Sequence, residues 1–263
     1  MARKLQWNSI ALFSAVFCVA LAARLLSLIL DPMPQRDAVL YLFLAERWQE
    51  TGDYAQAIAG GTIVPPLPLF TIVKLMDWGL PSEIAGRGIA LFLGSMIPVL
   101  GYYISYKIFK DALIAGISAF FFIFHPVLIS YSIQPLRENY YLFFLCLTII
   151  AAINGIKNKR VQDWGLCGIF LAFSVYSRYE SLELLIFIPL ILFYLHFKKK
   201  ITFKKTLSQL FVLFAANAMT TILLLSITGN DISFITKISK YSDKLIQQNN
   251  VRDYIQIDSK DLK

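Results

Sequence analysis

The chain has 263 residues, of which 57% are hydrophobic and 16% are charged, and its mean hydropathy is +0.60. Soluble domains carry about 25% charged residues, so this composition excludes a soluble globular protein and indicates an integral membrane protein. The formal net charge is +8, but the basic residues form short clusters between apolar runs, at 3–4, 107–110, 157–160 and 198–205. Such clusters are typical of cytoplasmic loops, whereas a nucleic-acid-binding protein gathers its basic residues on one solvated face.

A membrane-spanning helix takes about 20 mainly apolar residues. The sequence predicts an all-α fold, a polytopic transmembrane bundle of about seven spans, at residues 7–30, 84–109, 112–131, 139–156, 164–176, 182–197 and 209–228. The first run could instead be a signal peptide cleaved after Ala22, but it continues to Leu30, so we expect a retained anchor. Arg24 and Arg87 lie near the outer ends of their helices, where long side chains can snorkel to the interface.

One orientation satisfies all the loops. With a cytoplasmic N-terminus, every basic cluster faces the cytoplasm, and the loops at 31–83, 132–138 and 177–181 lie outside. We expect residues 1–228 to form the transmembrane domain and 229–263 to form a polar C-terminal tail. Aliphatic helices with lysine-rich cytoplasmic loops suit a bacterial inner membrane.

The first outer loop, 31–83, is predicted to carry short interfacial helices. One covers residues 36–51, with Asp37 near its N-terminus and Gly52 as a stop signal. Prolines at 65, 66 and 68 cannot continue a helix, and a second short helix is expected at 69–80. Farther along, Arg178 and Glu180 place two charges in a long apolar stretch. A turn at the outer surface is favoured there over one long helix with a buried ion pair, because charges at bilayer depth are costly.

Ionisable residues recur on the predicted outer face, at Arg36–Asp37, Arg87, Arg137–Glu138 and Arg178–Glu180. They could simply mark helix ends at the water interface, with carboxylates near helix N-termini. If the fold gathers them in one place, they could instead form a site that binds a phosphate. Arginine binds phosphate with two parallel hydrogen bonds, and a nearby carboxylate can act as a general base or hold a metal. Such a site suits a lipid with a phosphate head.

Several stretches, taken together and in order, resemble the GT-C glycosyltransferases, the polytopic enzymes of the dolichyl-phosphate-mannose mannosyltransferase and aminoarabinose transferase type. The matching stretches are Arg36-Asp37-Ala38-Val39-Leu40-Tyr41, Gly52-Asp53-Tyr54, Pro65-Pro66-Leu67-Pro68-Leu69, Ala85-Gly86-Arg87, Pro135-Leu136-Arg137-Glu138 and Ser177-Arg178-Tyr179-Glu180-Ser181-Leu182. The resemblance covers roughly residues 1–200. It implies transfer of a sugar from a polyprenyl-phosphate carrier to a lipid, glycan or protein acceptor at the outer face.

The resemblance also implies roles for individual residues. Asp37 matches the catalytic base of the first loop, and Glu138 matches a second acidic position. Four arginines are candidates to bind the substrate phosphate, and two residues are expected to support the site. The arginines are Arg36, Arg87, Arg137 and Arg178, and the supporting residues are Glu180 and Tyr41. A divalent cation held by Asp37 and Glu138 stays open, whereas neither His125 nor His196 has a partner at metal-ligand spacing.

The sequence departs from the family pattern in three respects. Ala38 directly follows Asp37 where Glu is common, and Tyr179 stands where Pro is common. The chain is also shorter than most members, which leaves open a truncated product, a fragment or one half of a split enzyme. Two other functions stay open as well: a transporter, and a non-catalytic membrane scaffold of the same fold.

Overall fold

The computed structural model describes residues 2–58, 64–158, 160–198 and 201–227. Within these ranges every regular element is a helix, so the predicted all-α fold is confirmed. The predicted polar tail at 229–263 lies outside the described residues.

Five described helical segments are long and apolar enough to cross a membrane. They are Ile10–Leu30 in α1 (Ala2–Leu30), α5 (Ser82–Phe109), α8 (Arg137–Asn158), Tyr179–Phe197, and α11 (Phe203–Ile227). The fourth segment joins the 3₁₀ turn η1 (Tyr179–Glu183) to α10 (Leu184–Phe197). The chain is therefore a multi-pass membrane protein.

The third and fifth predicted spans differ from this set. The run at 112–131 is broken into α6 (Ala112–Phe124) and α7 (Pro126–Ser132), which meet at an angle of 59°. Pro126 causes the break, because its nitrogen cannot donate the helical hydrogen bond and its ring favours the first turn of a new helix. The run at 164–176 is α9 (Val161–Ser177), which has 17 residues and packs between α8 and α11. The described residues thus contain five helices long and apolar enough to cross a membrane, or six with the bent pair, and the number of about seven spans stays a prediction.

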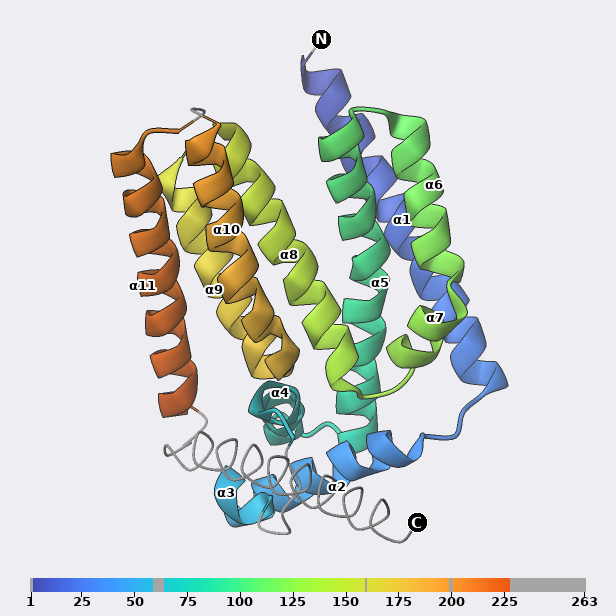
Figure 1. Cartoon of the computed structure of the whole chain (residues 1–263). Coiled ribbons are helices and arrows are strands. Elements are labelled where there is room, and N and C mark those ends of the chain that lie inside the picture. The colour runs from blue at the N-terminus through green and yellow to red at the C-terminus, as the bar shows by residue number, and fades with distance from the viewer. Residues whose placement is uncertain (1, 59–63, 159, 199–200, 228–263) are drawn as a thin grey trace, which may run out of the picture.

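The long helices stand side by side in two groups, as Figure 1 shows. One group contains α1, α5, α6 and α7, and the other contains α8, α9, α10 and α11; α5 packs against α8 and joins them. The C-terminal ends of α5, α8 and α10 lie at the same end of the bundle as the start of α1. The described basic residues there, among them Lys107, Lys110, Lys157 and Lys198, therefore lie at the end opposite to α2.

The other end of the bundle is covered by α2 (Arg36–Thr51), α3 (Tyr54–Ala57) and α4 (Pro66–Asp77). The predicted helix at 36–51 and its stop are confirmed, since Gly52 has a φ of 68° and its N–H bonds to the Trp48 carbonyl. The second short helix begins at Pro66, earlier than expected. A proline in the first turn loses no helical hydrogen bond, because the N–H groups of that turn have no partner within the helix.

A cluster of buried hydrophobic side chains packs α2, α3 and α4 against one another. Tyr41, Trp48, Tyr54 and Ile72 are all buried in it, and the Trp48 and Tyr54 rings meet edge to face at 5.0 Å. Such burial holds α2 against α4, and α4 in turn contacts α5 and α9. The residues of α2 consequently have fixed positions relative to the ends of the long helices.

Arg24 is not placed as predicted. Its side chain is fully buried within the bundle and donates to the Ala20 carbonyl at 3.0 Å, so it does not snorkel to the interface. Arg24 lies on the face of α1 that packs against neighbouring helices, whereas snorkelling requires a lipid-facing position.

Candidate functional site

Three segments that are distant in sequence bring the predicted site residues together. The first turns of α2 carry Asp37 and Tyr41, which lie four residues apart and hence on one face of the helix. The first turn of α8 carries Arg137 and Glu138. The third segment is the junction of α9 and η1, where the helix ends and Arg178 has extended backbone. The predicted turn at 177–181 is thus confirmed as a break between two helices.

Ion pairs join the second and third segments. Glu138 lies 3.5 Å from the Arg137 Nε and 3.4 Å from the Arg178 Nη1, and Arg178 Nε also contacts Glu180 at 2.9 Å. The guanidinium of Arg178 lies over the Tyr141 ring, 5.7 Å from its centre. Glu138 is only 17% exposed, whereas both arginines are about one-third exposed. The arginines therefore reach solvent and could meet an anionic ligand.

Tyr41 connects this charged group with α2. Burial raises the pKa of the Tyr41 hydroxyl above its ordinary value. The positive charges of Arg137 and Arg178 act against this shift, and the carboxylates of Glu138 and Asp37 add to it. All four charged residues are thus close enough to Tyr41 to act on it electrostatically. We call these five residues the charged cluster.

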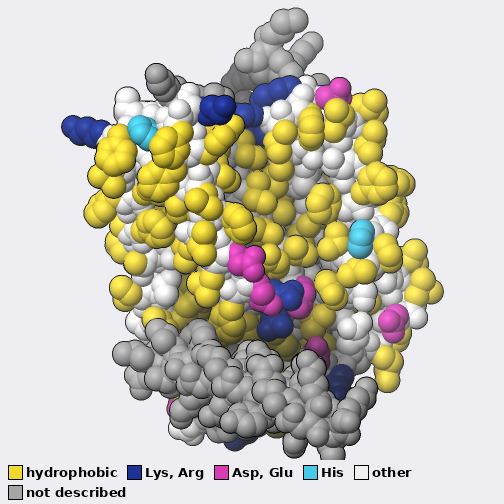
Figure 2. All heavy atoms as spheres, viewed as in Figure 1, with side chains coloured by type: hydrophobic (Ala, Val, Ile, Leu, Met, Phe, Trp, Pro, Cys, Tyr) yellow, Lys and Arg dark blue, Asp and Glu magenta, His cyan; other side chains and the backbone are white. Residues whose placement is uncertain are grey.

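The surface of the molecule shows the same gathering. In Figure 2, acidic and basic side chains meet low on an otherwise hydrophobic face, near the lower ends of α8 and α10 in Figure 1. Helix α10, which continues from η1, exposes apolar side chains, among them Ile186, Phe187 and Leu190. A polar site therefore borders the lipid-facing surface, at the end of the bundle that α2 covers.

Two predicted phosphate-binding residues are placed apart from the charged cluster. Arg87 pairs with Glu83 at 3.0 Å and donates to the Pro32 carbonyl at 2.6 Å, so its contacts lie within α5 and the segment before α2. Arg36 is exposed at the first residue of α2. The two contacts of Arg87 are explained by the protein itself and give no evidence of phosphate binding. The phosphate-binding roles of Arg36 and Arg87 therefore stay predictions.

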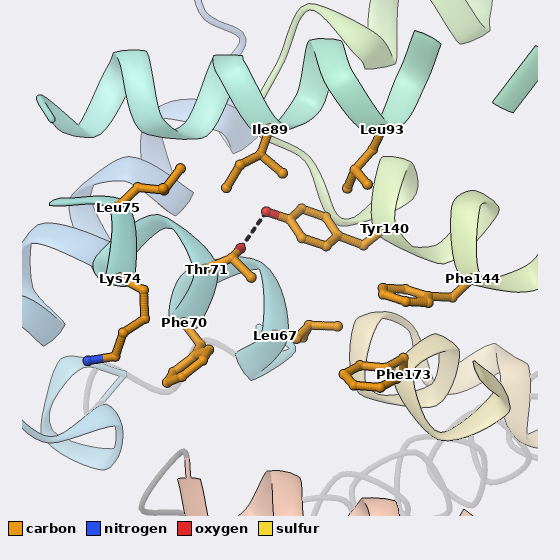
Figure 3. Close-up of a pocket in the computed structure, with 10 residues that line it drawn as sticks. All are labelled: Leu67, Phe70, Thr71, Lys74, Leu75, Ile89, Leu93, Tyr140, Phe144 and Phe173. Atoms are coloured by element: carbon orange, nitrogen blue, oxygen red, sulfur yellow. Dashed lines mark hydrogen bonds between the residues drawn. The ribbon is translucent and has the colours of Figure 1, made fainter. Parts of the chain in front are cut away.

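An apolar cavity of about 390 Å³ lies between α4, α5, α8 and α9. Figure 3 shows its lining, with Tyr140, Phe144 and Phe173 on one side and Leu67 and Thr71 of α4 opposite. The Thr71 and Tyr140 hydroxyls hydrogen-bond to each other at 2.5 Å, so each has a partner inside the otherwise apolar cavity.

The cavity and the charged cluster lie on the same helices. Tyr140 is three residues after Arg137 on α8, and Phe173 is five residues before Arg178 at the end of α9. At 1.5 Å per residue these steps are one to one and a half turns. Lys74 lies at the cavity's edge, its amino group paired with Asp77 at 2.8 Å.

Metal-binding groups are a separate question. Among the residues that the structure describes, no three His, Cys, Asp or Glu side chains converge to hold an ion. Asp37 and Glu138 together supply two carboxylates near Tyr41.

Two residues near the site were missed by the sequence analysis. Gln134 is fully buried and bonds to the segment before Asp37, and Tyr141 lies under the Arg178 guanidinium. A signal for Gln134 was present, since it is an amide in a mostly apolar stretch just before Arg137. Tyr141 gave none, because tyrosine is common throughout the chain.

Comparison with known proteins identifies a family. The family model described as dolichyl-phosphate-mannose-protein mannosyltransferase matches residues 64–224, which is more than half of the chain. The matched range contains the arginines at 87, 137 and 178 but begins after Asp37 and Tyr41. No curated protein matches the sequence. The chain belongs to the dolichyl-phosphate-mannose-protein mannosyltransferase family, and it is a membrane glycosyltransferase by that membership.

Proposed function

We propose that this membrane glycosyltransferase moves a sugar from a polyprenyl-phosphate carrier to an acceptor hydroxyl at the outer face of the membrane, with Asp37 as the general base. The observation that carries the proposal is the charged cluster beside an apolar cavity. A lipid-phosphate sugar has matching parts: a long apolar tail, an anionic phosphate and a polar sugar.

Asp37 is suited to act on the acceptor. Its carboxylate is exposed at the first turn of α2, at the edge of the charged cluster. In the proposed step Asp37 takes the proton of the acceptor hydroxyl. The hydroxyl oxygen forms a bond to the anomeric carbon of the sugar, and the bond from that carbon to the phosphate oxygen breaks. The electron pair leaves with the polyprenyl phosphate.

The arginines are suited to the leaving group. Negative charge grows on the phosphate as its bond to the sugar breaks, and fixed positive charges stabilise it most where water is scarce. Arg137 and Arg178 are both partly exposed, and Glu138 lies between them as their common partner. Glu180 pairs with Arg178 on its other side and would orient it. A phosphate would share the arginines with these carboxylates.

The cavity is suited to the first part of the lipid tail. It is lined mainly by aromatic and aliphatic side chains from four helices, and it lies about one to one and a half turns deeper than the charged cluster. A polyprenyl chain that enters it would bury apolar surface and place its phosphate near the helix ends. Lys74 at the edge, now paired with Asp77, is a further cation for that phosphate.

The distribution of charge supports an orientation for the protein in the membrane. The described basic residues at the C-terminal ends of α5, α8 and α10 lie at the end opposite to α2, and lysine-rich loops face the cytoplasm. This arrangement supports a cytoplasmic N-terminus and an outer-facing charged cluster. A bacterial inner membrane is the proposed location.

The test is sugar transfer by membranes that contain the chain. Radiolabelled polyprenyl-phosphate sugars, dolichyl-phosphate mannose among them, are supplied to the wild type and to Asp37→Asn. Loss of a well-placed base costs about 10²–10⁴ in rate, so transfer should fall by that factor. The isosteric change keeps the size of the side chain.

Asp53→Asn is the matched control. Asp53 lies on the same loop and caps α3 by accepting from the Ala55 N–H at 2.8 Å, a role that asparagine fills equally well. Its transfer rate should equal that of the wild type. Full activity of Asp37→Asn, or equal losses in both variants, would contradict Asp37 as the base.

A further inference from the structure

The segment immediately before Asp37 has little local structure to direct it. Residues 31–35 join α1 to α2 and include Pro32 and Pro34, neither of which has an N–H to donate. The residue before α2, Gln35, forms no side-chain cap with the helix. The direction in which α2 begins must therefore be set by contacts with the rest of the molecule.

Gln134 provides two of these contacts with one amide. Its side chain is fully buried. The Nε2 donates to the Met33 carbonyl at 3.1 Å, and the Oε1 accepts from the Gln35 N–H at 3.1 Å. The nitrogen and the oxygen of the amide thus each form a hydrogen bond with a backbone group of the same short segment.

The same residue is tied to the segment that carries the arginine and carboxylate of α8. Asn139, which follows Glu138 and is 1% exposed, donates to the Gln134 carbonyl at 3.1 Å and to the Tyr131 carbonyl at 2.7 Å. Gln134 itself lies three residues before Arg137. One hydrogen-bonded unit therefore reaches both the start of α2 and the start of α8.

Two further side chains hydrogen-bond to the same segment. The Gln35 side chain donates to the Ser130 hydroxyl at 3.2 Å in an exposed position, and Arg87 donates to the Pro32 carbonyl at 2.6 Å. Arg87 contacts Pro32, which lies five residues before Asp37, whereas Gln134 contacts Gln35, which lies two residues before Asp37. Of these side chains, Gln134 is both fully buried and bonded at two points.

We propose that Gln134 is a positioning residue that fixes the first turn of α2, which carries Asp37, relative to the first turn of α8, which carries Arg137 and Glu138. This inference rests on the proposed function, in which Asp37 is the base. Displacing a reacting group by about 1 Å can cost 10²-fold in rate. Loss of the Gln134 amide should therefore lower kcat by about that factor, with little change in the KM for the lipid donor.

Gln134→Leu removes both hydrogen bonds and keeps a side chain of similar bulk. The matched control is Gln209→Leu on α11. Gln209 is also fully buried, but neither of its amide atoms has a hydrogen-bond partner among the described residues. Its replacement should leave kcat unchanged. Gln134→Met removes the same two hydrogen bonds with an unbranched side chain of similar length, so its kcat should fall by the same factor as that of Gln134→Leu.

The decisive measurement is a double-mutant comparison of single-turnover rates in reconstituted protein. If Gln134 acts through Asp37, then Gln134→Leu adds little further loss in an Asp37→Asn background. A merely structural role would lower the rate by the same factor in both backgrounds. Hydrogen exchange of residues 33–39 should also be faster in Gln134→Leu and unchanged in Gln209→Leu.

The outcomes separate the two proposals. A fully active Asp37→Asn, or no turnover with any polyprenyl-phosphate sugar, overturns the proposed function and this inference with it. An inactive Asp37→Asn together with a wild-type rate for Gln134→Leu, or with additive losses, overturns only the role of Gln134. If Gln134→Leu fails to fold, the same comparison is made with Gln134→Met.

Discussion

At the scale of single residues, Arg178 has the richest set of contacts in the charged cluster. It meets Glu138, Glu180 and the Tyr141 ring, and it lies where α9 ends and the backbone becomes extended. Its guanidinium is held by two carboxylates that a phosphate could partly replace. A bidentate arginine suits such an exchange, because it can keep one carboxylate while it binds a phosphate oxygen.

Replacement of Arg178 tests this role. Removal of one fixed group that stabilises transition-state charge costs about 10²–10³ in kcat, so Arg178→Gln should lose that much transfer activity. Lys204→Gln on α11, an exposed cation at the opposite end of the bundle, is the control for loss of one positive charge. Equal rates for the two variants would remove Arg178 from the mechanism.

Some of the residue-scale arrangement could be predicted from the sequence. Asp37 and Tyr41 share a helix face by their spacing alone, and Arg137 and Glu138 are neighbours in the chain. The approach of Arg178 to Glu138 joins positions 40 residues apart and depends on how α8 packs against α9. The spacing of residues along the chain does not predict how those two helices pack. The bonds of Gln134 to residues about 100 positions earlier are of the same kind.

At the scale of elements, α4 forms one wall of the apolar cavity. Pro66 and Pro68 lie in its first turn, and Leu67 and Thr71 face Tyr140 across the cavity. The prolines predicted an interruption of the chain, and the structure uses them to begin a helix. The rule that prolines end helices applies to helix interiors, whereas first-turn positions accept them.

Filling the cavity should weaken the binding of long lipid tails. Leu93 on α5 lines the cavity, so Leu93→Trp should raise the KM for a long-chain polyprenyl-phosphate sugar by about tenfold, equivalent to about 1.4 kcal/mol. A donor with a tail too short to reach the cavity should be unaffected. Phe92→Trp, at the adjacent 53% exposed position, is the control. A KM that does not depend on tail length would show that the tail binds elsewhere.

At the scale of the whole molecule, the two ends of the bundle differ in character. One end has the basic residues at the C-terminal ends of α5, α8 and α10, and the other has α2, α4 and the charged cluster. The sequence predicted this polarity correctly because charge placement is a property of loops, which are easily located. It did not predict that Pro126 divides one apolar run into two helices that meet at 59°, because the hydropathy of the run is continuous across the break.

Single-cysteine labelling tests the orientation. In a background with the three native cysteines replaced by alanine, Glu50→Cys on α2 should react with a membrane-impermeant maleimide in intact cells. Lys110→Cys, at the opposite end between α5 and α6, should react only after permeabilisation. The reversed pattern would place the charged cluster in the cytoplasm.

The central claim is that the charged cluster acts on a lipid-phosphate-linked sugar. The most direct measurement supplies reconstituted wild-type protein with one radiolabelled sugar carried either by polyprenyl phosphate or by a nucleotide, and follows transfer of the label. The account predicts transfer from the polyprenyl carrier alone, and a loss of about 10²-fold or more in Asp37→Asn. Transfer from the nucleotide carrier, or lipid-dependent transfer that Asp37→Asn leaves intact, would contradict it.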